Sequence, residues 1–311
     1  MILSDSTPSD SVCDGDQAVR SQQKTTLFQL ELDYRNINCG MSYVIQMRNG
    51  EFFLIDGGYF TDGEEERLYR FLSARAPDGD IRIAGWFFSH AHQDHIGNFI
   101  NFISRYRESV TIGCFLYRIQ PVDYSCIRGD WKSCDEATVR EFHRILDGYV
   151  PDVPRKILKT GDRFSFHELE FEVLFTYPDL RSGGATFNDH STILRMTIEG
   201  QRILWLGDIG TAGSRSLLRL PEEKLRCDIV QVAHHGYNGA SLELYRKLNA
   251  SVALWPTPSY SMSANANSPV NNFLLNGSGI REHIVGGEGT VEMTLPYVPC
   301  TARRELPQFV S

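Results

Sequence analysis

The segment SHAHQDH, residues 89–95, contains three histidines and one aspartate in close succession. Imidazole and carboxylate groups are good ligands for zinc and similar divalent ions. The segment follows the apolar run IRIAGWFF and precedes GNFINFISRY, and these patterns predict a buried strand and then a helix. This order places the histidines at the carboxyl end of a strand, where open α/β sheets commonly carry their functional sites.

The spacing within this segment predicts two metal ions. Side chains along an extended chain alternate in direction, so His90 and His92 are expected to point the same way. After the chain turns into the helix, Asp94 and His95 can face the same cavity from another side. A polar loop with incidental histidines is the competing interpretation, and this density of ligand residues argues against it.

Further ligands are expected at the ends of other strands. Asp208 ends the apolar run RILWLGD, and we predict that it bridges the two ions. His234 and His235 follow the run CDIVQVA; one is expected to be a ligand and the other to be structural or catalytic. His190 precedes STILRMTI, whose pairing with the strand before Asp208 would bring it to the same edge. For His190, a plain surface histidine is the alternative.

The size and charge of the chain limit its fold and partners. The chain has 311 residues, of which 41% are hydrophobic, so it can bury a large core. We predict a polar, flexible tail over residues 1–24 and one large domain over residues 25–311. The net charge of -8 argues against an extended footprint on duplex nucleic acid, because neutralising many phosphates requires a basic surface. The charge does not exclude a small molecule or a short or single-stranded nucleic acid as substrate.

Two further features predict a cytoplasmic protein. No apolar run approaches the roughly 18 residues needed to span a bilayer, and the first residues lack the basic and apolar regions of a signal peptide. The seven cysteines are scattered and form no CxxC pair, which indicates reduced thiols. We therefore expect no membrane association and no disulfide framework.

The rest of the chain is predicted to alternate strands and helices. The runs after Thr25 predict an antiparallel meander, and EEERLYRFLSARA predicts an amphipathic helix over residues 64–76. Another helix is expected over residues 137–149. Residues 257–280 are rich in Ser and Asn and are predicted to be irregular or mobile, before a last hairpin around GTVEMTL.

The most loop-like part of the middle of the chain, residues 119–136, is a candidate rim for the substrate. Arg128, Trp131 and Lys132 in this stretch are candidates to bind a phosphate and to stack on a base. A solvated loop with one anchoring tryptophan is the simpler interpretation of the same residues.

Taken together, these motifs resemble the metallo-β-lactamase-fold hydrolases. The chain is most similar to the branch that resembles the hydrolase domain of the DNA-uptake channel protein of competent bacteria. The resemblance covers about residues 26–297. The motif most specific to these hydrolases is HxHxDH followed by a later GD. It rests on LIDGG at 54–58, HxHxDH at 90–95, NDHSTIL at 188–194, LGD at 206–208 and HHG at 234–236.

The resemblance implies an α/β fold with two mixed β-sheets packed face to face and helices outside, an αββα four-layer sandwich. It also implies a dinuclear site for two divalent ions, for which Zn²⁺ is the preferred assignment and Mn²⁺ or Fe²⁺ are alternatives. By motif match, the ligands are His90, His92, Asp94, His95, Asp208 and one of His234 and His235. Asp56 would support the metal loop from behind.

Two departures from the family pattern affect these expectations. Many members have a Gly-His loop before the hairpin that carries Asp208, whereas this chain offers only His190 there, so its role toward the first ion stays open. The sequence contains no transmembrane channel portion, so we do not expect a role in DNA uptake.

Hydrolysis is the reaction expected from such a site, with Asp94 or Asp208 orienting the nucleophile. Bound metal lowers the pKa of water to about 7 and stabilises charge on the attacked centre. True β-lactamases of this fold often carry a thiolate where Asp208 stands, and the carboxylate favours a phosphodiesterase that acts on a nucleotide or a short nucleic acid. The alternatives are a carboxylic ester, thioester or lactone hydrolase with the same ions, and a degenerate binding module that cannot hold both.

Overall fold

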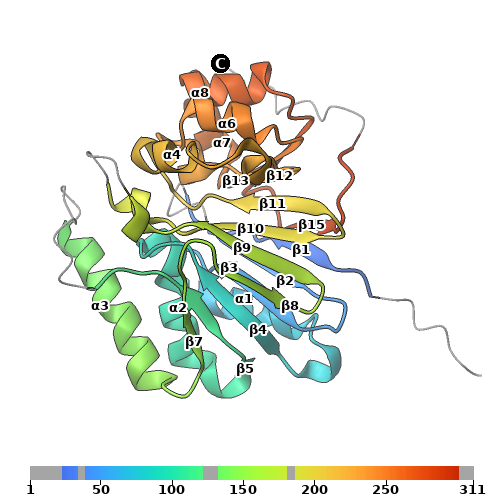
Figure 1. Ribbon diagram of the computed structural model, residues 1–311. Helices are drawn as coiled ribbons and strands as arrows, with labels where there is room; N and C mark the ends of the chain where they lie inside the picture. Colours follow the sequence, from blue (N-terminus) through green and yellow to red (C-terminus); the bar gives the residue numbers. More distant parts are fainter. Residues whose placement is uncertain (1–22, 34–38, 122–131, 181–185, 301–311) are drawn as a thin grey trace, which may run out of the picture.

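Two β-sheets packed face to face form the centre of the molecule, and helices cover both outer sides (Figure 1). The computed structural model describes residues 23–33, 39–121, 132–180 and 186–300. The α/β class and the αββα sandwich predicted from the sequence are confirmed.

The first sheet combines the N-terminal meander with the strand that precedes SHAHQDH. Its strands are β1 Thr26–Gln29, β2 Ser42–Gln46, β3 Phe52–Asp56, β4 Arg82–Phe88, β5 Thr111–Ile112, β6 Phe115–Tyr117, β7 Arg155–Ile157 and β15 Val291–Thr294. They lie in the order β15-β1-β2-β3-β4-β6-β7, with β5 paired to β4. The strands β1, β2 and β3 pair antiparallel, as predicted, and β4 continues parallel to β3.

The second sheet brings together the strands that precede Asp208 and His235. Its strands are β8 Arg163–Phe166, β9 Leu169–Phe175, β10 Ile193–Ile198, β11 Gln201–Trp205, β12 Ile229–Gln231, β13 Val252–Pro258 and β14 Glu282–Gly286. Their order is β14-β13-β12-β11-β10-β9-β8. The strands β11 to β14 run parallel, so their carboxyl ends lie at one edge of the sheet.

The helices fall into two outer layers (Figure 1). The layer on the first sheet contains α1 Glu64–Ser73, α2 Gln93–Tyr106 and α3 Lys132–Tyr149. The layer on the second sheet contains α4 Thr211–Leu217, α5 Glu222–Leu225, α6 Leu242–Leu248, α7 Ser259–Ala264 and α8 Pro269–Asn272. Short helical turns are η1 Pro77–Gly79, η2 Arg107–Ser109, η3 Tyr177–Asp179, η4 Phe187–His190, η5 Ala233–Gly236 and η6 Phe273–Gly277.

Three apolar layers hold these elements together. Phe99 and Phe102 of α2 pack on Trp86 of the first sheet. Tyr43 and Trp205 meet between the two sheets, with ring centroids 4.8 Å apart. Because burying one large apolar side chain stabilises a fold by about 1.5–3 kcal/mol, these layers fix the sheet ends that carry the ligand residues.

Some element bounds differ from the prediction. The helix α2 begins at Gln93 rather than Gly97, so Asp94 and His95 stand in its first turn. The helix α3 begins at Lys132 rather than Ala137, and α1 ends at Ser73. Side-chain periodicity locates the middle of a helix better than its ends, which explains these differences.

The predicted hairpin around GTVEMTL is wrong. The strand β15 pairs antiparallel with β1 of the first sheet, whereas β14 pairs with β13 of the second sheet. The chain therefore crosses between the two sheets at this point. Alternation of apolar residues identifies both strands but does not identify their partners.

The prediction that residues 257–280 are irregular is also wrong, because they include α7, α8 and η6. The polar side chains of this segment support the helices. Ser268 Oγ accepts a hydrogen bond from the Asn271 backbone N–H, which caps α8. The buried side-chain amide of Asn271 donates to Gly236 O at 2.6 Å and so ties the segment to the turn after β12.

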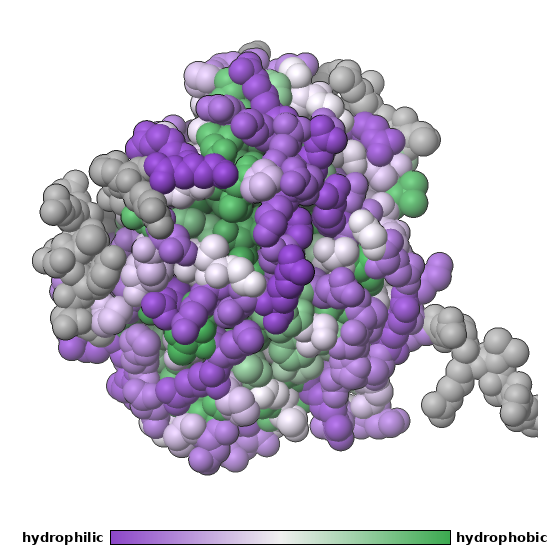
Figure 2. Space-filling model, viewed as in Figure 1, coloured by the Kyte–Doolittle hydropathy of each residue, from purple (hydrophilic) through white to green (hydrophobic). Residues whose placement is uncertain are grey.

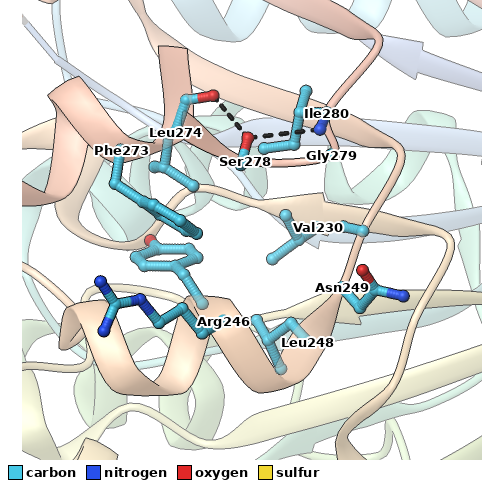
Figure 3. Close-up of a pocket in the computed structure, with 11 residues that line it drawn as sticks. Val230, Arg246, Leu248, Asn249, Phe273, Leu274, Ser278, Gly279 and Ile280 are labelled. Atoms are coloured by element: carbon cyan, nitrogen blue, oxygen red, sulfur yellow. Dashed lines mark hydrogen bonds between the residues drawn. The ribbon is translucent and has the colours of Figure 1, made fainter. Parts of the chain in front are cut away.

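A small void lies inside the layer between the second sheet and its helices. It measures about 40 Å³ and is lined by apolar side chains that include Val230, Leu248, Phe273 and Ile280 (Figure 3). Ser278 Oγ closes one side by donating to Leu274 O. The void can hold water but is too small for a substrate, because each water needs about 10–15 Å³.

Hydrophilic residues cover most of the face seen in Figure 2, with hydrophobic residues visible between them. Among the helices of the described ranges, none combines the length and the apolar character needed to cross a bilayer. The four cysteines whose side chains are described, at 39, 114, 227 and 300, are free thiols. Most of the predicted tail, residues 1–22, lies outside the described part, and the domain boundary at residue 25 stays a prediction.

Candidate metal centre

Six side chains of metal-ligand type meet where β3, β4, β11 and β12 end, and they come from both sheets. We call His90, His92 and Asp208 the first ligand group. We call Asp94, His95, Asp208 and His235 the second ligand group. Within each group the ligand atoms lie within 4.8 Å of one another, and the two groups share Asp208.

The first ligand group is partly open to solvent. His90 Nε2 lies 3.0 Å from His92 Nδ1 and 3.8 Å from Asp208 Oδ2. His90 and Asp208 are buried, whereas 22% of the His92 side chain is exposed. His92 keeps an extended backbone at the start of α2, which lets its ring lie beside that of His90.

The second ligand group is more enclosed. His235 Nε2 lies 3.0 Å from Asp94 Oδ2 and 3.3 Å from Asp208 Oδ2. His95 Nε2 lies 3.1 Å from Asp208 Oδ1 and 3.2 Å from His235 Nε2. Both carboxylate oxygens of Asp208 therefore face this group, and Oδ2 also lies toward His90, so Asp208 is suited to bridge two ions.

The far nitrogens of the buried imidazoles contact acceptors in the body of the protein. His95 Nδ1 lies 2.7 Å from Asp56 Oδ2, and Asp56 also accepts hydrogen bonds from the backbone N–H and hydroxyl of Ser89. His235 Nδ1 lies 2.9 Å from Pro256 O, and His90 Nδ1 lies 3.1 Å from Ser89 Oγ. These acceptors favour a proton on each Nδ1, which leaves Nε2 as the donor to a metal.

This donor set fits divalent cations. With their protons on Nδ1, His95 and His235 present two Nε2 lone pairs to each other at 3.2 Å, beside the carboxylates of Asp94 and Asp208. Such an arrangement of acceptors requires a proton or a metal cation among them. Imidazole nitrogen and carboxylate oxygen are the ligands that Zn²⁺, Mn²⁺ and Fe²⁺ accept.

Without metal, protons take the place of the cation in the second ligand group. Burial lowers the pKa of His235, but the carboxylates of Asp208 and Asp94 outweigh burial and raise it to about 9. The same balance holds the pKa of His95 well above its ordinary value. Burial raises the pKa of Asp208, but His235 and His95 hold it well below its ordinary range. Metal binding here would displace protons.

Two turns with left-handed backbone shape the centre. Gly207 has φ +51, and a Cβ there would lie 2.8 Å from Ser191 Oγ, so the LGD motif requires its glycine. His234 and His235 have φ 52 and 55, a conformation that costs energy for residues other than glycine. Asp56 shares this feature, with φ 52. Three of the seven non-glycine residues with positive φ in the described ranges thus lie in or next to the site.

Residues 40–112 match the model of the Metallo-beta-lactamase superfamily, and no curated protein sequence matches the chain significantly. The fold is similar to that of the metallo-beta-lactamase fold protein YhfI from Bacillus subtilis, with 11% identity over 86% of this chain and 99% of that chain and a TM-score of 0.52. The chain has the metallo-β-lactamase fold. It is also similar to CmlA, a diiron beta-hydroxylase from Streptomyces venezuelae, at 12% identity over 88% of this chain and 54% of that one, with a TM-score of 0.50.

At these identities the likeness of solved structures concerns the metallo-β-lactamase fold alone. The chain spans about half the length of CmlA, at 54%. The closer resemblance to the hydrolase domain of the competence protein stays a prediction.

Within this metallo-β-lactamase fold, two of the predicted histidines fall in neither ligand group. His234 points to the neighbouring loop, where its Nε2 lies 3.2 Å from Asn188 Nδ2. His190 is buried beside the rings of Tyr177 and Phe187, and burial lowers its pKa to about 4. Of the two adjacent histidines, His235 therefore has the position of a ligand.

Sequence reasoning missed three residues next to the centre. The thiol of Cys39 donates to Asp94 Oδ2 at 3.2 Å. Asp135 in the first turn of α3 lies 3.5 Å from His92 Nε2, through its Oδ1 atom. Asp189 accepts hydrogen bonds from the backbone N–H groups of Gly210 and Gly213, and so holds the loop after Asp208. The sequence offered one signal for each aspartate: Asp189 lies in the NDHSTIL motif, and Asp135 lies in the predicted substrate rim.

Little of the predicted substrate rim can be compared with the structure. Arg128 and Trp131 lie outside the described residues, and the side chain of Lys132 is not described, although its backbone begins α3. Their role in binding a phosphate or a base stays a prediction.

Proposed function

We propose that this protein is a metal-dependent hydrolase with a dinuclear centre. The observation that carries the proposal is the shared carboxylate of Asp208, which belongs to both ligand groups. We assign His90, His92 and Asp208 to the first ion, and Asp94, His95, Asp208 and His235 to the second. We propose that both ions are Zn²⁺, with Mn²⁺ or Fe²⁺ as alternatives, because the donors are imidazoles and carboxylates.

The residues of the centre have different roles in the proposed hydrolysis. Two divalent ions would supply a water with a pKa near 7 and stabilise negative charge on the attacked centre and on the leaving oxygen. Asp208 holds its two oxygens toward both ligand groups, and Asp94 Oδ2 lies on the partly exposed side of the second. Either carboxylate can accept a hydrogen bond from the attacking water and orient it. Asp56 and Ser89 fix the rings behind them.

The substrate that we propose is a phosphodiester, in a nucleotide or a short nucleic acid. Two lines of support exist: the resemblance of the motif set to phosphoester-cleaving members of the family, and the carboxylate at position 208 in place of a thiolate. The net charge of -8 favours a small or short substrate over extended duplex nucleic acid.

Metal content tests the dinuclear centre. We expect about two ions per chain, measured by elemental analysis of protein purified without chelator, and fewer in the variant His92→Ala. A wild-type chain that stays near zero after reconstitution with zinc or manganese would contradict the proposal and favour a non-catalytic binding module.

Paired substrates test the chemistry. We expect turnover of bis(p-nitrophenyl) phosphate to exceed that of p-nitrophenyl acetate when both are compared with His92→Ala as the background. Activity confined to the acetate would reject the phosphodiesterase and leave the carboxylic ester hydrolase.

A further inference from the structure

Three of the four imidazoles in the ligand groups have partners on the strand and turn segments at the sheet ends. The fourth, His92, has its partner on a helix instead. The far nitrogens of His90, His95 and His235 face Ser89, Asp56 and Pro256. His92 turns the other way: its Nδ1 faces His90 Nε2, so its far nitrogen is Nε2. Among the described residues, the carboxylate beside that nitrogen is Asp135, whose Oδ1 lies 3.5 Å away.

The contact with Asp135 comes from a different part of the fold. Asp135 lies in the first turn of α3, and 11% of its side chain is exposed. The helix packs on the first sheet through Val139, Phe142 and Ile145, so its position is fixed by the apolar core. A carboxylate held in this way can keep its place beside His92 whether or not metal is bound.

The ring of His92 is also held from its face. Phe187 of η4 stacks on it with centroids 4.7 Å apart and planes 27° from parallel. Stacking restricts the tilt of the ring but leaves open a rotation about the Cβ–Cγ bond that would put Cδ2, which cannot bind a metal, in the place of Nδ1. A carboxylate beside Nε2 selects the tautomer with its proton there and leaves the Nδ1 lone pair for a metal.

We propose that Asp135 is a positioning residue, which orients His92 and selects the tautomer that binds the first ion. This inference rests on the proposed dinuclear centre. According to this inference, the affinity for the first ion depends on the start of α3, whereas the affinity for the second ion does not. Removing a partner of this kind typically costs about 10–100-fold in metal affinity.

Cobalt(II) titration of the metal-free full chain tests the inference. Visible absorption reports the number and geometry of the ligands, and competition with a chelator gives the affinity of each binding step. We expect two steps in the wild type. In Asp135→Ala the weaker step should lose about 10–100-fold in affinity, with a changed spectrum, while the tighter step stays the same.

Two further variants separate positioning from other effects. Asp135→Asn keeps an oxygen acceptor beside Nε2, so it should recover part of the affinity lost in Asp135→Ala. Glu136→Gln removes a charge from the same turn of α3 and should titrate as the wild type. The Tm of the metal-free proteins should be equal for all of them.

Each contrary result has a distinct meaning. Equal affinities in the wild type and Asp135→Ala would overturn the inference and leave the proposed function intact. A lower metal-free Tm together with equal losses in both steps would assign Asp135 a purely structural role and also overturn it. A wild type without cobalt binding would overturn the proposed function and this inference together.

Discussion

The two ligand groups differ in enclosure and in charge, although they share Asp208. The second group surrounds its centre with two carboxylates and two imidazoles, of which only Asp94 is noticeably exposed, at 17%. The first group has one carboxylate and two imidazoles, and His92 is its open side. We therefore expect the second ion to be bound tightly and the first to be weaker and closer to the substrate.

The largest effect should follow from changing the shared residue. Asp208→Asn removes a charge that both ions require, so we expect loss of both ions and a fall in kcat/KM of more than about 10²-fold, since even changes behind the ligands cost up to that amount. Elemental analysis and turnover of bis(p-nitrophenyl) phosphate measure these effects. Asp208 lies at a loop edge, so the circular dichroism spectrum should be unchanged. Full activity in this variant would refute the assignment.

Single histidine variants should separate the two groups. His92→Ala is expected to abolish turnover while one ion per chain remains, because the second ligand group is intact. His95→Ala removes a ligand of the enclosed group and should lower the content of the tighter ion. Metal-to-protein ratios and kcat/KM for the two variants measure the difference. Equal loss of both ions in both variants would show that the two groups bind metal cooperatively. It would contradict the expected difference in affinity between them.

Removing metal should occur in two stages as chelator concentration rises. The first ion should leave at lower chelator concentration, with loss of activity, and the second should leave later, with a fall in Tm of at least a few degrees. The reason is mass action: an ion present at 100 times its Kd stabilises the fold by about 2.7 kcal/mol. Differential scanning calorimetry follows the change. A single stage that removes activity and stability together would contradict two unequal ions.

The smallest effect should come from Cys39, which forms a hydrogen bond with Asp94 of the second group. Cys39→Ala removes the thiol that donates to Asp94 Oδ2, and because S–H is a weak donor we expect this hydrogen bond to contribute no more than the roughly 0.5–1.5 kcal/mol of an ordinary one. We expect a modest loss of affinity for the tighter ion and recovery in Cys39→Ser, which keeps a donor. Chelator competition measures it. A selective effect on the weaker ion would contradict the assignment of Asp94 to the second group.

The sequence predicts those parts of the centre that depend on local pattern. HxHxDH lies on one short segment, and the carboxyl ends of the strands before Asp208 and His235 follow from apolar runs that stop at turn residues. The alternation of strands and helices indicates an α/β protein, whereas the αββα sandwich is implied by the resemblance of the motifs to the metallo-β-lactamase-fold hydrolases.

Features that depend on contacts between distant segments could not be predicted. Asp135 reaches His92 only because α3 packs beside α2, and no spacing along the chain reveals this. The choice between His234 and His235 depends on two successive residues with positive φ, which turn the adjacent rings in different directions. The pairing of β15 with β1 likewise depends on the crossing between sheets.

The ligand residues are also far apart in the order of synthesis. His95 and His235 face each other across 140 positions of sequence. A ribosome therefore exposes HxHxDH long before it supplies Asp208 and His235. During that interval the early histidines can bind a cation only weakly and without the selectivity of the finished site. Correct metal loading should thus follow docking of the second sheet on the first, and the supply of metal to the completed chain should determine which ion the protein carries.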